Sequence, residues 1–215
     1  MSYIIIGEIF HEWNGIVLLL LFIFHNILNK QWYKILFKGK YNALRIIQTV
    51  VIILIIVFFI ILMTSGLILS RHIFKFINIS GFTVLSRSLH LLAAYWFFLF
   101  ISVHLGLHSN KIIMKINKLY RLKYTKKTIL YLIRGFYVSA SLYGLYAFLK
   151  HNYLDYILFR TQFIYFDLNI SKLLFFLDYL AIMSMVTLLF FCIKFILTIF
   201  RNKLKYYKRK ILFIQ

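Results

Sequence analysis

The chain of 215 residues contains no proline, one cysteine and only five acidic residues. Without proline, its apolar stretches lack the residue that most strongly interrupts a helix. With Cys192 as the single thiol, an internal disulfide and a multi-cysteine metal centre are both excluded. The 26 lysine and arginine residues far outnumber the acids and give a formal net charge of +21. In a soluble protein such a charge would indicate nucleic-acid binding.

The chain is instead strongly apolar, since 63% of its residues are hydrophobic and its mean hydropathy is +0.86. Several apolar runs exceed the roughly 20 residues that a helix needs to cross a bilayer. We expect spans over residues 4–29, 46–70, 84–108, 129–149 and 173–199. Helices are the only plausible spanning element for runs of this length. The sequence therefore predicts an all-α membrane protein with five transmembrane helices.

The basic residues alternate between dense and sparse connections. Residues 30–45, 111–127 and 201–210 hold five, seven and six of them, whereas residues 71–87 and 150–172 hold three each. Such alternation follows the positive-inside rule and is better explained by orientation and lipid headgroups than by nucleic acid. It predicts a multi-pass protein of the cytoplasmic membrane, with the N-terminus outside and the C-terminus in the cytoplasm.

The acids agree with this orientation, and the first residues lack the basic segment that begins a cleavable signal peptide. The acidic residues, all expected at or near the outer side, are Glu8, Glu12, Asp155, Asp167 and Asp178.

Two spans carry the same histidine spacing. His11 and His25 lie fourteen residues apart, as do His90 and His104. Fourteen helical residues rotate by about 1400°, about 40° short of four full turns, and rise by about 21 Å. Both histidines of a pair therefore share one helix face, one toward each leaflet. Because the first and third spans run in the same direction, we expect His11 opposite His90 near the outside and His25 opposite His104 near the cytoplasm.

Two opposed imidazoles favour one kind of cofactor. A zinc ion usually takes four protein ligands, so two histidines leave it undercoordinated. A b-type haem has only two axial positions left, and two such haems would form an electron path across the membrane. The pattern predicts two b haems whose iron ligands are the four paired histidines, because ionisable residues inside a membrane are usually functional. For His72 and His151 we prefer an ordinary helix-end role.

His108 offers a second candidate for the inner site. It stands four residues after His104 and on nearly the same helix face. The first span has Asn29 at the equivalent place, which offers no comparable ligand. Repeat symmetry therefore favours His104 as the ligand, and His108 could instead bond a haem propionate or a quinone.

Small and basic residues surround both histidine levels. A flat macrocycle needs room between helices, although ordinary helix packing explains any single small residue equally well. The small candidates are Gly15, Gly66, Ala93, Ala94 and Gly106. Arginine and lysine could also pair with the anionic propionates. The basic candidates are Arg71 and Arg87 at the outer level and Lys30 and Lys111 at the inner level.

Three stretches resemble a bacterial family of cytochrome-b-like membrane domains of unknown function. They are "HEWNGIVLLLLFIFHNILNKQWYK" (11–34), "SGLILSRHIF" (65–74) and "LHLLAAYWFFLFISVHLGLH" (89–108). The family pattern is a helix that opens with His, Glu-Trp and Gly, a second His, and a Ser-Gly pair that closes the next helix. His11, His25, His90 and His104 match the histidines of the pattern, and His108 matches a further one.

The resemblance covers about residues 1–110, which we expect to form a three-span di-haem unit. Residues 111–215 add two further spans and a basic tail, and the first four helices are expected to form the haem-binding bundle. The resemblance implies an electron-transfer subunit of the bacterial inner membrane, encoded in some genomes beside flavin-bearing extracytoplasmic redox proteins.

The predicted function is electron transfer across the cytoplasmic membrane, between a quinol or cytoplasmic donor and an extracytoplasmic flavoprotein or other redox protein. The sequence carries no glycine-rich nucleotide motif and no recognisable flavin site, so a subunit is expected rather than a self-sufficient enzyme. A proton or cation transporter is the alternative, although mid-depth carboxylates and broken helices are missing. A non-redox assembly factor or anchor is a third possibility.

Overall fold

The computed structural model describes residues 7–39, 41–76, 81–119, 127–161 and 171–212. Its helices are α2 (Glu8–Leu28), α3 (Lys30–Ile35), α4 (Ala43–Leu69), α5 (Thr83–Leu119), α6 (Lys127–Lys150), α7 (Tyr153–Ile157) and α8 (Lys172–Leu212). No strand occurs in these described ranges. Five of the helices (α2, α4, α5, α6 and α8) are long and apolar enough to cross a membrane, which confirms the predicted fold class.

Two helices extend well past their expected spans. The span predicted to end at residue 108 belongs to α5, which runs to Leu119, and the span predicted to end at residue 199 belongs to α8, which runs to Leu212. Hydropathy marks the part of a helix that suits lipid, whereas lysine and asparagine allow the backbone to remain helical beyond it. With no proline present, the sequence offers no strong stop signal at those points.

Local contacts explain where α2 ends and where α4 begins. The side chain of Asn29 donates to the carbonyl of His25 at 2.7 Å, at the junction between α2 and α3. Asn42 caps α4, because its side-chain oxygen accepts from the backbone N–H of Arg45 at 2.9 Å. The Arg45 guanidinium also donates to the carbonyls of Ile35 and Lys38 at 2.6 and 2.7 Å. This arginine therefore holds the connection between α3 and α4 in place.

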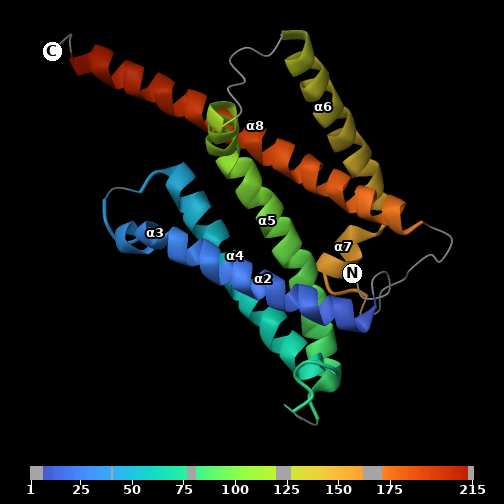
Figure 1. Cartoon of the computed structure of the whole chain (residues 1–215). Helices are drawn as coiled ribbons and strands as arrows, with labels where there is room; N and C mark the ends of the chain where they lie inside the picture. Colours follow the sequence, from blue (N-terminus) through green and yellow to red (C-terminus); the bar gives the residue numbers. More distant parts are fainter. Residues whose placement is uncertain (1–6, 40, 77–80, 120–126, 162–170, 213–215) are drawn as a thin grey trace.

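The central helix is α5, which packs along α4 on one side and along α8 on the other (Figure 1). In the same view α2 crosses α4 and α5 at an angle, and α6 lies against α8. Although α2 is apolar, none of its residues is fully buried. Exposed leucine, isoleucine and phenylalanine side chains on these helices suit contact with lipid tails.

The helices α5, α6 and α8 approach one another closely at glycine. A Cβ added at Gly144 of α6 would lie 2.1 Å from the carbonyl oxygen of Ala181 on α8. A Cβ at Gly106 of α5 would lie 2.6 Å from the carbonyl oxygen of Thr187, also on α8. Gly106, one of the small residues expected to make room for a macrocycle, instead allows two helix backbones to meet.

Candidate functional site

A cavity of about 580 Å³ lies between α2, α4 and α5. It occupies the end of this helix group where α2 begins, α4 ends and α5 begins, here called the acidic end because Glu8 and Glu12 lie there. The cavity is lined by seven residues that the sequence singled out: His11, Gly15, Gly66, Arg71, Arg87, His90 and Ala94. Its volume lies within the range of small-molecule and cofactor sites.

The rings of His11 and His90 meet across this cavity. Their centroids lie 6.0 Å apart, and their planes are inclined by 76°. Because imidazole nitrogens approach a metal ion to about 2.0–2.1 Å, two rings bonded to one ion from opposite sides have centroids about 6 Å apart. The same distance also suits edge-to-face contact between two rings. The predicted outer pair is therefore brought together at a spacing that a shared metal ion could bridge.

Residues of α4 hold the His90 ring in place. Its Nδ1 atom lies 3.1 Å from the carbonyl oxygen of Leu62 and 3.1 Å from Oγ of Ser65. A carbonyl oxygen can only accept, so Nδ1 carries the hydrogen and the lone pair is left on Nε2. A Cβ added at Gly66 would lie 3.3 Å from Cε1 of His90, so a glycine leaves room for the ring. The Ser-Gly pair of the sequence pattern, Ser65 and Gly66, thus packs against the His90 ring.

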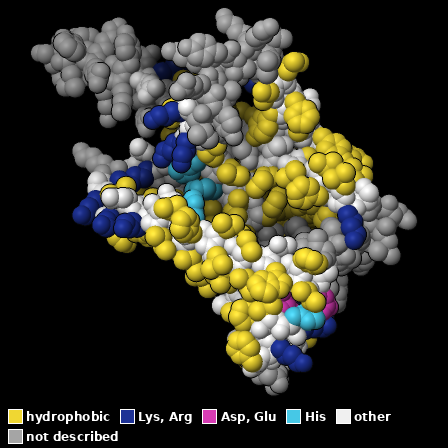
Figure 2. Space-filling view, in the orientation of Figure 1, with side chains coloured by type: hydrophobic (Ala, Val, Ile, Leu, Met, Phe, Trp, Pro, Cys, Tyr) yellow, Lys and Arg dark blue, Asp and Glu magenta, His cyan; other side chains and the backbone are white. Residues whose placement is uncertain are grey.

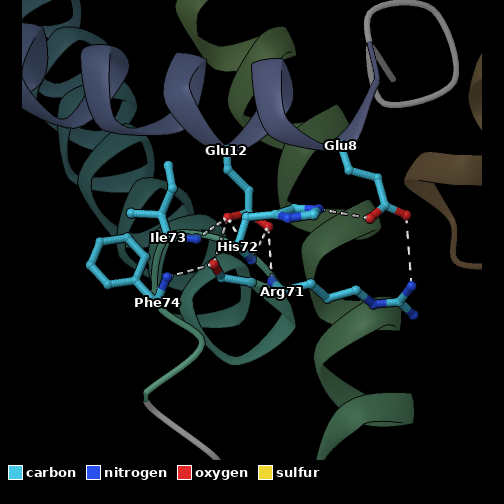
Figure 3. Close-up of polar contacts among 7 residues, drawn as sticks. Glu8, Glu12, Arg71, His72, Ile73 and Phe74 are labelled. Atoms are coloured by element: carbon cyan, nitrogen blue, oxygen red, sulfur yellow. Dashed lines mark hydrogen bonds and ion pairs between the residues drawn. The ribbon is translucent and has the colours of Figure 1, made fainter.

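Glu12 binds the segment that follows α4 (Figure 3). Its carboxylate accepts from Oγ of Ser70 at 2.7 Å and from the backbone N–H groups of Arg71 and Ile73 at 2.8 Å each. The backbone N–H of His72 lies 3.3 Å from both carboxylate oxygens. Sequence reasoning placed Glu12 only on the outer side, because nothing local indicates a partner some sixty residues away.

Glu8 contacts side chains of the same segment (Figure 3). Its carboxylate lies 3.6 Å from the Arg71 guanidinium and 3.2 Å from Nε2 of His72. His72 was expected to occupy an ordinary helix-end position, and it does lie just beyond α4, but its ring contacts a carboxylate. Arg71, predicted to pair with a propionate, lines the cavity and is already paired with Glu8.

Three histidines gather at the opposite end of this helix group, here called the basic end. The rings of His104 and His108 lie 4.5 Å apart, and His25 is close enough to both to interact with them electrostatically. His25 is exposed, and among the described residues it makes no ring contact with His104 like that of His11 with His90. Nε2 of His108 is buried and has no hydrogen-bond partner within the described part of the chain.

Lysine side chains surround these histidines. The ammonium of Lys194 on α8 donates to the carbonyl of Leu107 at 2.6 Å, and Lys111 lies within electrostatic range of both Lys194 and His108. Figure 2 shows histidine side chains beside Lys or Arg at one end of the visible face and beside both Asp or Glu and Lys or Arg at the other. The two ends thus differ in charge.

A buried carboxylate lies outside the cavity, between α6 and α8. Asp178 is fully buried and accepts from the Tyr143 hydroxyl at 2.6 Å, while Lys150 and His151 lie 3.0 and 2.8 Å from its other oxygen. His151 was expected to occupy an ordinary helix-end position, and it belongs to an ion-pair network. Because three groups contact the carboxylate, this network has a structural explanation.

The described ranges contain no group of three or more His, Cys, Asp or Glu side chains that could hold a bare metal ion. Comparisons of the chain with models of protein families, with curated proteins and with solved structures found no match. The resemblance to cytochrome-b-like domains therefore stays a prediction that depends on the quoted motifs alone.

Proposed function

We propose that this protein is a di-haem b-type cytochrome that carries electrons across a membrane. The observation that supports this best is the cavity at the acidic end, where the rings of His11 and His90 lie 6.0 Å apart between three helices. A b haem held by these two histidines would supply reversible one-electron transfer. The residues of the cavity fit such a group in size and in donor type.

His11 and His90 are the proposed outer iron ligands. The hydrogen bond from Nδ1 of His90 to the Leu62 carbonyl orients this ring, and a hydrogen bond of this kind also increases the basicity of a ligating imidazole. Gly15, Gly66 and Ala94 keep the cavity walls free of bulky side chains. The two imidazoles would bind the flat group.

Arginine at the rim of the cavity would face the anionic edge of the cofactor. Arg87 lines the cavity and forms no ion pair with an acid in the described residues. Arg71 also lines it but is shared with Glu8. Arg87 is therefore the better candidate for a carboxylate partner, since charge-assisted pairs of this kind need a free guanidinium.

The proposed inner ligands are His25 and one of two histidines on α5. The repeat spacing favours His104, whereas the buried Nε2 of His108 without a partner favours His108. Lys30 and Lys111 remain candidates to pair with the propionates of the inner haem. Single substitutions can separate the two cases, as described in the Discussion.

The acidic end would face outward and the basic end the cytoplasm, as the distribution of lysine and arginine indicates. Electrons would pass between a quinol or cytoplasmic donor and an extracytoplasmic flavoprotein or other redox protein in a bacterial inner membrane. The cavity binds a redox group in this proposal, and the chain would act as a subunit of a larger oxidoreductase.

A proton or cation transporter is the second candidate. The network of Asp178, Lys150 and His151 at the ends of α6 and α8 favours it, because buried ionisable residues of membrane helices often mark proton pathways. Purified protein that takes up protons in vesicles and shows no haem absorption would support the transporter instead.

The test is a pyridine haemochrome assay on purified protein expressed with ample haem. We expect two b haems per chain, one haem in His11→Ala or His90→Ala, and two in the control His72→Ala, because His72 lies outside the cavity lining. Protein without a Soret band under these conditions would contradict the proposed function.

A further inference from the structure

We propose that Glu12 is a positioning residue, a carboxylate clamp that sets His11 of α2 against His90 of α5. This inference rests on the proposed function for its redox consequence, while the clamp itself can be tested without haem. It concerns four partners in one short segment: Ser70, Arg71, His72 and Ile73.

The contacts of Glu12 differ in kind from an ordinary surface ion pair. Three backbone N–H groups and one hydroxyl point at a single carboxylate, with the three shortest contacts at 2.7, 2.8 and 2.8 Å. Hydrogen bonds to an ionised acceptor are about twice as strong as neutral ones. The Ser70 hydroxyl also accepts from the backbone N–H of Phe74 at 3.0 Å, so the segment is folded around the acid.

The clamp joins the frames of the two histidines. Glu12 follows His11 directly in α2, so fixing the carboxylate fixes the start of that helix. Ser70 directly follows α4, whose last two turns carry Leu62 and Ser65, the two residues that hold His90. A short series of polar contacts thus connects the start of α2 at His11 with the end of α4, which holds His90.

The rest of α2 provides little that could replace the clamp. None of its residues is fully buried, and its apolar contacts with α4 and α5 centre on Leu18, Leu19 and Phe22. Phe22 stacks on Phe59 with ring centroids 3.7 Å apart. These contacts lie two to three turns from His11, whereas Glu12 is its neighbour in the chain and acts on its position most directly.

The chain offers a matched control. Glu8 lies one turn before Glu12 on the same face of α2. It is also a carboxylate, and it contacts the side chains of Arg71 and His72, which are 67% and 41% exposed. Exposed pairs contribute little to positioning. Glu8→Gln and Glu12→Gln therefore make the same chemical change at a contact with exposed side chains and at a contact with backbone N–H groups.

The first measurement is a distance between spin labels, made on the full chain in lipid nanodiscs without haem. Labels would be placed at Val17→Cys on α2 and Val84→Cys on α5, both exposed, in a Cys192→Ser background. We expect one narrow distance distribution for the parent and for Glu8→Gln, and a broad or shifted one for Glu12→Gln. An amide has a single acceptor oxygen, and its NH₂ group would face backbone donors.

The second measurement uses the same variants loaded with haem. Glu12→Gln should weaken outer haem binding by about tenfold or more, since each hydrogen bond to a charged group contributes about that factor. It should also decrease the low-spin bis-imidazole signal of the outer haem, while the inner haem keeps its signal and its midpoint potential. The inner haem therefore serves as an internal reference that general unfolding would not spare.

Other variants keep the inference falsifiable if Glu12→Gln does not fold. Ser70→Ala removes only one of the contacts to Glu12, and Glu12→Asp shortens the acid, so each should give a smaller change in the same direction. An unchanged label distance with an unchanged outer signal in Glu12→Gln would overturn the clamp. So would equal changes in Glu8→Gln. A parent that binds no haem would reject the proposed function, while the label distances would still decide the clamp.

Discussion

The half of the molecule formed by α2 and α4 against α5 is open on the side of α2, whereas the half formed by α6, α7 and α8 against the same helix is closely packed. The open half holds a cavity of about 580 Å³ and is joined at one end by a carboxylate. The closed half has helix backbones in contact at Gly144 and Gly106. The difference indicates that α5 separates a region with a cavity, the proposed cofactor site, from a region of close packing.

Aromatic side chains complete the closed half. Tyr95 of α5 stacks on Tyr156 of α7 with ring centroids 4.5 Å apart, and the hydroxyl of Tyr153 donates to the carbonyl of Tyr95 at 3.0 Å. The Tyr153 side chain is fully buried, and this burial raises the pKa of its hydroxyl, which therefore stays protonated and able to donate. The apolar cluster that α2 joins contains no tyrosine among the described residues.

The largest effect on the free energy of unfolding is expected at Asp178. Asp178→Asn would leave Lys150 and His151 beside a neutral amide, and breaking a buried pair usually costs about 3–5 kcal/mol. We expect the lower end of that range, because the Lys150 side chain is 26% exposed. Thermal unfolding in detergent measures the loss. Haem content per folded chain should be unchanged, and a parallel loss of haem would mean that the two halves are not separable.

A smaller effect on stability is expected at Gly144. Gly144→Ala would place a Cβ 2.1 Å from the carbonyl oxygen of Ala181 and force α6 and α8 apart. Overpacking of this kind typically costs about 1–3 kcal/mol. Gly135→Ala on the same helix is the control, because no atom lies within 4 Å of its added Cβ. If both variants unfold at the parental temperature, the close packing of the closed half is not needed for stability.

The corresponding test in the open half compares Gly66 with Gly15. Gly66→Ala would bring a Cβ to 3.3 Å from the His90 ring and should shift that ring, lowering outer haem occupancy with little loss of stability. Gly15→Ala meets no atom within 4 Å and is the matched control in the cavity lining. Absorption spectra of the reduced protein report occupancy. Equal occupancy in the two variants would argue that His90 does not hold the cofactor.

The smallest contrast lies between His104 and His108, which share one helix face at the basic end. Replacing the inner ligand by alanine should remove one haem, whereas replacing its neighbour should only shift the midpoint potential. Redox titration of His104→Ala and His108→Ala, with the outer haem as reference, assigns the ligand. Two haems in both variants would indicate that either imidazole can serve or that the inner site lies elsewhere.

Much of the open half could be predicted from sequence because helical spacing is a local rule. Fourteen residues place His90 and His104 on one face whatever the rest of the chain does, and four of the residues singled out in the sequence, His11, Gly15, His90 and Ala94, line one cavity. The role of Glu12 could not be predicted, since its partners lie some sixty residues away and are mostly backbone groups.

Packing in the closed half was equally hidden. Gly106 shows the difficulty, because a small residue suits a macrocycle and a neighbouring helix equally well, and only the position of α8 decides between them. Asp178 is similar, since its position in an apolar span does not indicate that Tyr143, Lys150 and His151 contact its carboxylate.

The shared position of α5 has a consequence for insertions and deletions. One face of this helix presents His90 to the cavity, and another presents Tyr95 to the aromatic cluster. A single added residue between His90 and Tyr95 would turn these two faces by about 100° relative to each other. Length changes should therefore be rare in this part of the helix among natural variants.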